Sequence, residues 1–200
     1  LYGHPMHVTD ELLDVMGGTE QVCRYLDIPV QHADDEILKR MGRKGSRVEY
    51  LDVVQRIRKR LPGVTLRTTC LVGFPGETEK RFAELAGFVK DARFDRLGVF
   101  TYSKEEGTRA FAMKETVSKK SKEQRRDDLL QIQSEIIDLN AARRVGKTEE
   151  LLVDRLIPGN GLAGRSCGEA PEVDGEIIVE KNANGIKPGS GLSIMRERIQ

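Results

Sequence analysis

Hydrophobic and polar residues follow two periodicities in the first half of the chain. Short apolar runs predict β-strands, at 25–31, 64–72 and 96–102. Apolar residues at helical spacing fill the intervals, at 37–41, 51–61 and 82–89, and Asp34 and Thr78 are suited to cap two of these helices. The order strand, helix, strand, helix, strand predicts an α/β unit with one parallel sheet and right-handed crossovers.

The central run, 64–72, is expected to be a fully apolar strand in a sheet covered by helices on both faces. In such sheets, ligands bind beyond the carboxyl ends of the strands. Polar residues and turns follow all three predicted strands, at Gln31 with His32, at 73–77 and at Tyr102 with Ser103. We therefore expect one rim where these three strand ends meet.

The most informative of these ends is the turn in Leu-Val-Gly-Phe-Pro-Gly-Glu, residues 71–77. Gly73 and Gly76 would allow the backbone to approach a ligand without an intervening side chain. The alternative is a tight strand-to-helix connection with no ligand. His32 leaves two interpretations open as well, a catalytic group or a hydrogen-bond partner behind the site.

The second half of the chain has a different pattern of hydrophobic, charged and turn-forming residues. Residues from about 118 to 145 predict one long, highly charged helix. Short β-rich runs follow, at 151–153, 176–179 and 191–195, and turn signals separate them at 158–161, 182–185 and 188–189. We therefore expect two domains, one at 1–145 that includes the connecting helix and a small antiparallel barrel or sandwich at 147–200.

Composition predicts a cytoplasmic protein that does not contact a membrane. The 200 residues are 38% hydrophobic and 32% charged, and no apolar stretch is long enough for a membrane span. Cys23, Cys70 and Cys167 are too far apart in sequence for a metal or iron–sulfur motif, and each is expected to be a buried or half-buried thiol. The chain begins at Leu1, and three strands cannot close a barrel, so we expect a fragment.

Three long segments closely resemble the methylthiotransferases of the radical S-adenosylmethionine (SAM) superfamily. They are Tyr-Leu-Asp-Ile-Pro-Val-Gln-His-Ala-Asp-Asp-Glu-Ile-Leu-Lys-Arg-Met-Gly-Arg (25–43), Leu-Arg-Thr-Thr-Cys-Leu-Val-Gly-Phe-Pro-Gly-Glu-Thr-Glu (66–79) and Arg-Phe-Asp-Arg-Leu-Gly-Val-Phe-Thr-Tyr-Ser-Lys-Glu-Glu-Gly-Thr (93–108). Ala-Pro-Glu-Val-Asp-Gly at 170–175 resembles their C-terminal TRAM domain. The resemblance implies a partial TIM-type parallel half-barrel followed by a small antiparallel β-barrel.

Within that family, the chain is most similar to the members that add a methylthio group to an aspartate of small-subunit ribosomal protein twelve. The family implies SAM and two 4Fe-4S clusters as cofactors. The superfamily's CxxxCxxC loop is absent from the chain, so the chain by itself is expected to hold no cluster and to be inactive. Two alternatives stay open: a transfer-RNA methylthiotransferase of the same family, and a non-catalytic module that binds the ribosome.

The resemblance also implies site residues. Gln31 and Arg43 match positions that contact the ribose and the methionyl carboxylate of SAM, and Thr69 matches one that faces the nucleoside. The turn formed by Gly73, Phe74 and Pro75 matches the segment placed against the adenine. Taken alone, Arg43 could equally be a solvated cation at a helix end.

Charge separates the two candidate substrates. Residues 147–200 contain seven Lys and Arg against nine Asp and Glu, a net charge of −2. A domain that binds RNA phosphates is expected to be basic, whereas an acidic domain suits a basic ribosomal protein. We therefore expect the ribosomal protein rather than transfer RNA to be the partner, bound through Glu169, Glu172 and Asp174.

Overall fold

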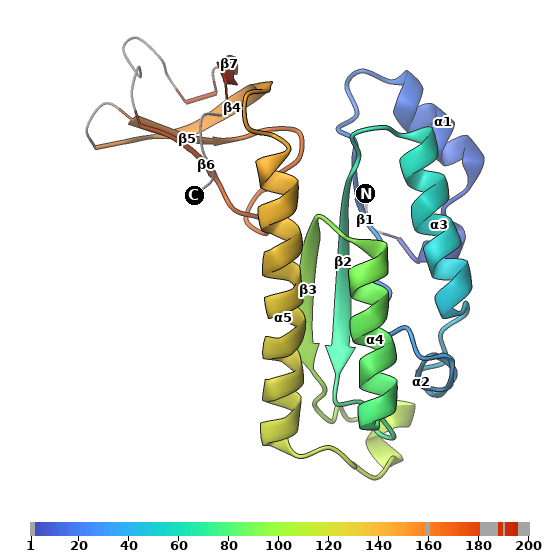
Figure 1. Cartoon of the computed structure of the whole chain (residues 1–200). Coiled ribbons are helices and arrows are strands. Elements are labelled where there is room, and N and C mark those ends of the chain that lie inside the picture. The colour runs from blue at the N-terminus through green and yellow to red at the C-terminus, as the bar shows by residue number, and fades with distance from the viewer. Residues whose placement is uncertain (1–2, 159–160, 181–187, 190, 196–200) are drawn as a thin grey trace.

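The protein contains two sheets joined by a long helix (Figure 1). The computed structural model describes residues 3–158, 161–180, 188–189 and 191–195. A parallel sheet has the order β1 (Tyr25–Asp27), β2 (Thr65–Val72), β3 (Arg96–Thr101). An antiparallel sheet has the order β6 (Ile177–Val179), β5 (Gly161–Arg165), β4 (Thr148–Ile157), β7 (Gly191–Met195). The expected parallel α/β unit followed by an antiparallel β-unit is confirmed.

Helices begin where short polar side chains can cap them. The helices are α1 (Asp10–Gly18), α2 (Asp35–Arg40), α3 (Arg47–Arg60), α4 (Glu79–Ala92) and α5 (Lys119–Ala142), with 3-10 turns η1 (Pro5–His7) and η2 (Arg109–Ala112). Asp34 and Thr78 each accept a hydrogen bond from a backbone N–H in the first turn of α2 and α4, as predicted. Ser118 caps α5 in the same way, so the predicted connecting helix is observed with slightly shorter bounds.

Two elements were not predicted from the sequence. Helix α1 is short and ends in two glycines, which weakens its helical signal. Strand β5 contains two glycines and only one large apolar residue, and pairing with β4 and β6 holds it in place. The predicted turn at 182–185 lies outside the described residues.

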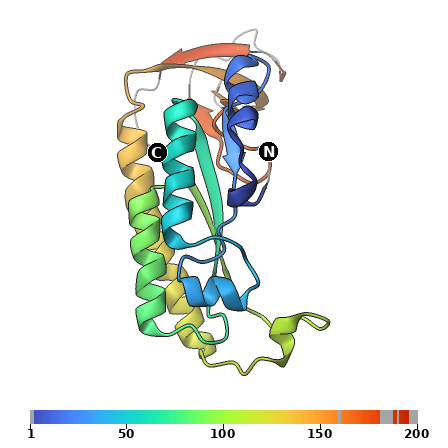
Figure 2. The ribbon, with the colours of Figure 1, turned by 90° about the vertical axis from the view of Figure 1, so that its right-hand side faces the viewer.

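The helices cover only one face of the parallel sheet (Figure 2). Burial alternates along β2: Leu66, Thr68, Cys70 and Val72 are buried, and the residues between them are half-buried. The expectation of a strand covered on both faces was wrong, because the sequence of β2 alternates and is not continuously apolar. We call the face that carries Thr65, Arg67, Thr69 and Leu71 the open face.

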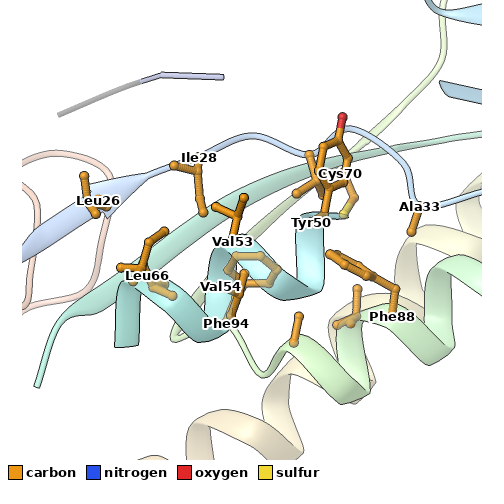
Figure 3. Packing of buried hydrophobic residues seen from close by; sticks show 14 of the residues in the cluster. Leu26, Ile28, Ala33, Tyr50, Val53, Val54, Leu66, Cys70, Phe88 and Phe94 are labelled. Atoms are coloured by element: carbon orange, nitrogen blue, oxygen red, sulfur yellow. The ribbon is translucent and has the colours of Figure 1, made fainter. Parts of the chain in front are cut away.

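The main core lies between the sheet and the helices (Figure 3). Strand residues such as Leu26 and Leu66 meet Val53 and Val54 of α3 in this core. Phe88 of α4 packs beside Phe94, with 6.1 Å between the ring centroids, and both rings are fully buried. This layer is the largest apolar cluster in the described part of the chain, so it supplies most of the hydrophobic stabilisation.

The C-terminal unit docks against the amino-terminal end of the open face. The Tyr25 hydroxyl donates a 2.6 Å hydrogen bond to Asp174 Oδ2. Glu169 accepts hydrogen bonds of 3.2 Å from Arg96 of β3 and from Arg144, just after α5. The side chains of Glu169 and Asp174 are only 4% and 3% exposed. Buried charges need partners, so these bonds fix how the two units meet.

We predict that Phe88→Ala lowers the free energy of unfolding by about 3–5 kcal/mol, because it leaves a cavity in the main core. Phe111→Ala is the matched control, since Phe111 is 44% exposed. The control should cost less than about 1 kcal/mol in the same urea titration. Equal losses for the two variants would contradict this account of the core.

The docking contact should also depend on pH. Burial tends to raise the pKa of Glu169, but hydrogen bonds from Ser166 and the charge of Arg144 outweigh it and hold the pKa below the ordinary 4.5. The contact therefore stabilises the protein above that value and is lost as pH falls through the lowered pKa. We expect Glu169→Gln to be less stable than the wild type at neutral pH and to approach it in acid, whereas the exposed control Glu150→Gln should match the wild type throughout. Urea titrations at neutral pH and in acid measure the free energy of unfolding of the three proteins.

Candidate cofactor-binding rim

The three strand ends meet at one rim, as predicted. Beyond β1, the Gln31 N–H donates to the Thr69 carbonyl at 2.8 Å, and the Gln31 carbonyl accepts from the Leu71 N–H at 2.7 Å. On the other side, the Tyr102 N–H donates to the Val72 carbonyl at 2.8 Å. Gln31 has a φ of 67°, a left-handed conformation that residues with side chains rarely adopt. Such backbone strain concentrates at functional sites.

A buried carboxylate joins the elements behind this rim. Glu77 Oε2 accepts from the Gly73 N–H at 2.9 Å, and Glu77 Oε1 accepts from Arg125 Nη1 at 2.7 Å. His32 Nε2 lies 3.3 Å from Glu77 Oε2. Because His32 Nδ1 accepts from the Asp34 N–H at 2.9 Å, a neutral ring carries its proton on Nε2 and donates it to Glu77. We call Glu77, His32, Gly73 and Arg125 the Glu77 cluster.

The Glu77 cluster settles the role of His32. The side chain is fully buried, and both ring nitrogens are occupied by protein partners. His32 is therefore a hydrogen-bond partner behind the rim, which was one of its two interpretations. The cluster itself was not predicted, because Arg125 lies in a highly charged segment where its sequence gives no sign that it is buried.

The two rim glycines make room for the protein's own side chains. Gly73 has a φ of 77°, and a Cβ there would lie 2.3 Å from Lys122 Cγ. A Cβ on Gly76 would lie 2.7 Å from an Arg40 guanidinium nitrogen. The expectation that these glycines clear space for a ligand is corrected here: on this side of the turn, the space is filled by Lys122 and Arg40.

Lys122 fastens the end of β3 to α5. Its Nζ donates to the Tyr102 carbonyl at 2.9 Å and to Glu115 Oε2 at 2.7 Å. Lys122 is only 7% exposed, and a buried ammonium group is tolerated only when partners such as these bind it. Phe74 packs against the Tyr102 ring, 5.2 Å between centroids, and Phe74 and Pro75 are both buried. The rim turn is thus a packed structure supported from behind.

The open face provides the floor in front of the rim. Thr69 is half-buried on this face and lies opposite Gly98 of β3. A Cβ on Gly98 would lie 3.5 Å from Arg67 Nη2 and 3.6 Å from both Thr69 Oγ1 and the Phe100 ring, so the glycine lies within reach of all three side chains. Phe100 is 60% exposed. Gly98 and Phe100 were not predicted as site residues, although a glycine inside a strand often marks a close approach.

Arg43 lies on the flank of the rim, where α2 leads into α3. Its Nη2 donates to the Pro29 carbonyl at 2.6 Å, and its Nε is buried without a hydrogen-bond partner. Burial and then the Arg43 charge lower the pKa of His4, which indicates that the two side chains are close. Gln31 and Thr69 are therefore joined by a backbone hydrogen bond, the 73–75 turn directly follows β2, and Arg43 binds the carbonyl of Pro29, two residues before Gln31.

No described residues form a metal site. Within the part of the chain that the structure describes, no group of three or more His, Cys, Asp or Glu side chains could hold a metal ion. Cys70 is buried, and burial raises the pKa of its thiol to about 12, so it stays protonated at neutral pH. Cys23 and Cys167 are exposed, which corrects the expectation that both are buried or half-buried.

The predicted partner-binding acids are not equivalent. Glu169 and Asp174 are buried and bonded to Arg96, Arg144 and Tyr25 in the docking contact. Glu172 is exposed and has a φ of 64°. Of the three, Glu172 alone lies at the surface.

Comparison with known proteins shows two domain matches and a set of similar enzymes. Residues 4–89 match the radical SAM superfamily and residues 145–194 match the TRAM domain. The chain is 44% identical to "Ribosomal protein uS12 methylthiotransferase RimO" of Pelotomaculum thermopropionicum, over 98% of this chain and 44% of the relative. A protein of the same name from Clostridium acetobutylicum is 42% identical over 97% of this chain and 43% of the relative. Over nearly its whole length, the chain is similar to these methylthiotransferases.

The chain spans less than half the length of these curated relatives. Its fold resembles coproporphyrinogen III oxidase (HemN) from Escherichia coli, with a TM-score of 0.52 and 21% identity over 65% of this chain and 29% of that one. It also resembles the archaeal Elp3 of Methanocaldococcus infernus, with a TM-score of 0.50 and 17% identity over 66% of this chain and 31% of that one. These two likenesses concern the fold alone. None of the described helices is long and apolar enough to cross a membrane.

We predict that Glu77→Gln lowers the free energy of unfolding by about 3–5 kcal/mol, because it leaves the buried Arg125 without its carboxylate. Glu79→Gln is the matched control: Glu79 also binds Arg125, but its side chain is 84% exposed. The control should cost less than about 1 kcal/mol by urea titration. A small loss for Glu77→Gln would show that the cluster does not hold the rim together.

Proposed function

We propose that this chain supplies the SAM-binding rim and the C-terminal docking unit of an enzyme that methylthiolates ribosomal protein uS12. The observation that carries the proposal is the 42–44% identity to relatives named for that activity, which extends over 97–98% of this chain. The chain spans only part of those relatives, so the activity concerns a protein of their length. Residues 1–145 and 147–200 are the proposed boundaries of the two units.

The open face and the rim suit a nucleoside. Thr69 and Gln31 are polar, half-buried residues at adjacent strand positions, joined by a 2.8 Å backbone hydrogen bond. Gly98 places no side chain beside Thr69, and the exposed Phe100 ring offers an apolar surface. We propose that Gln31 and Thr69 bind the ribose and the adjoining nucleoside and that the Gly73, Phe74 and Pro75 turn presents backbone atoms to the adenine.

The buried and unpartnered Arg43 Nε leaves one donor of that guanidinium available. We propose that Arg43 binds the methionyl carboxylate after a small side-chain movement, since its planar fork suits a carboxylate. When SAM is bound there and cleaved by one-electron reduction, it would supply the radical that abstracts hydrogen from the substrate. The described residues do not gather as cluster ligands, so no step of the reaction is assigned to an iron–sulfur cluster on this chain. We propose that the chain by itself is inactive and that both 4Fe-4S clusters are held elsewhere in a protein of the relatives' length.

The choice of uS12 over transfer RNA rests on charge as well as on similarity. Residues 147–200 carry a net charge of −2, which favours a basic protein partner over a polyanion. Glu172 is the proposed contact among the three predicted acids, because Glu169 and Asp174 are buried in the docking contact. We propose that the enzyme acts in the cytoplasm, where ribosomes are modified.

The test uses a protein of the relatives' length that contains this chain, reconstituted with iron and sulfide without oxygen. SAM and reductant are added with either uS12 or transfer RNA, and mass spectrometry looks for one added methylthio group. Modification of a uS12 aspartate supports the proposal. Modification of transfer RNA instead would establish the alternative enzyme, and binding to ribosomes without modification of either substrate would favour a non-catalytic module.

In the same protein, we predict that Gln31→Ala weakens SAM binding by at least about tenfold, the effect of losing a hydrogen bond worth about 1.5–3 kcal/mol. Isothermal titration calorimetry measures the change. Gln131→Ala, on the exposed side of α5, is the control and should bind SAM like the wild type. Unchanged affinity in Gln31→Ala would remove this residue from the site.

A further inference from the structure

Two cysteines with no role in the proposed function lie on opposite sides of the docking contact. Cys23 precedes β1 of the parallel sheet, and Cys167 follows β5 of the C-terminal sheet. They are 144 positions apart in the sequence, yet both are exposed and both line the cleft between the two units. The third cysteine, Cys70, is fully buried in the main core and provides an internal reference.

The C-terminal unit holds Cys167 on a tight turn. The Glu169 N–H donates to the Ser166 carbonyl at 3.3 Å, and the Gly168 N–H donates to Ser166 Oγ at 3.1 Å. Ser166 Oγ in turn donates to Glu169 Oε2 at 2.6 Å. Glu169 is the buried acid that binds Arg96 of the parallel sheet, so the turn is anchored at the contact between the units.

The parallel sheet places Cys23 near the turn that carries Cys167. The Thr65 N–H donates to the carbonyl of Arg24, the residue after Cys23, at 2.8 Å. Gly168, the residue after Cys167, packs against Thr65 so closely that a Cβ on Gly168 would lie 3.0 Å from Thr65 Oγ1. A single residue, Thr65, thus touches the neighbour of each cysteine. Burial raises the pKa of Cys167, and the charge of Cys23 raises it further, which agrees with their proximity.

We propose that Cys23 and Cys167 form a reversible disulfide that fastens the C-terminal sheet to the parallel sheet. A small disulfide such as oxidised glutathione is the oxidant. The thiolate of one cysteine attacks it and releases one glutathione thiolate, and the second cysteine then attacks the mixed disulfide and releases the other. The protein thiols lose two electrons and two protons, and the small disulfide becomes two thiols. A bond of this kind requires Cα atoms within about 7 Å.

The bond would make docking covalent. In the reduced protein, the two units are held by the Tyr25–Asp174 hydrogen bond and by the pairs of Glu169 with Arg96 and Arg144. Such contacts can open transiently, whereas a disulfide across the same contact would prevent the C-terminal sheet from leaving. The inference concerns the 200-residue chain itself and does not depend on its enzymatic activity.

The test treats the reduced chain with oxidised glutathione at about pH 8.5, where thiolates become available. Free thiols are then blocked with iodoacetamide, and non-reducing peptide mass spectrometry locates the bonds. We expect a Cys23–Cys167 cross-link within single molecules and slower proteolysis of residues 143–147 after oxidation. Cys70→Ser should cross-link like the wild type.

Cys23→Ser and Cys167→Ser are the matched variants. Each should instead accumulate a stable glutathione adduct on its remaining exposed cysteine, because the second attack cannot occur. Separate glutathione adducts on Cys23 and Cys167 of the wild type would overturn the proposal. A cross-link that joins two molecules, or one that uses Cys70, would overturn it as well.

Discussion

The buried carboxylate of Glu77 is the constraint on which the rim depends. A carboxylate that is almost fully buried is tolerated only when its oxygens are bonded. Its partners come from the loop after β1, the turn after β2 and the second turn of α5, so all three must be in place together. The requirement couples the conformation of the Gly73 turn to the docking of α5.

Helix α5 extends this coupling along the whole sheet. Near its start, Lys122 binds the end of β3 at the Tyr102 carbonyl. Further along, Gln133 Nε2 donates to the Phe94 carbonyl at 2.9 Å, and Asn140 Nδ2 donates to Asp95 Oδ1 at 3.0 Å. Just after its end, Arg144 binds Glu169 of the C-terminal unit. One helix, about 36 Å long by its 24 residues, therefore positions both the rim and the docking contact.

The sequence predicted periodic features well and buried polar contacts poorly. The three parallel strands, α4 with its Thr78 cap, and the long helix followed from spacing and capping residues. Lys122 and Arg125 could not be recognised as buried, because a charged residue in a charged helix normally faces solvent and only the fold shows which side packs. Glu169 and Asp174 were predicted as partner contacts for a similar reason: Arg96 and Tyr25, which bind them across the two units, lie more than 70 residues away in the chain.

We propose that the carboxyl ends of the parallel strands form a nucleoside site. The most direct measurement is nuclear magnetic resonance titration of the isotopically labelled chain with S-adenosylhomocysteine, which has the same nucleoside as SAM. If the nucleoside binds at this rim, the shifted amide signals are those of Gln31, Thr69 and Gly98 and of the 73–76 turn. Shifts confined to the cleft between the two units, or no shifts at all, would contradict it.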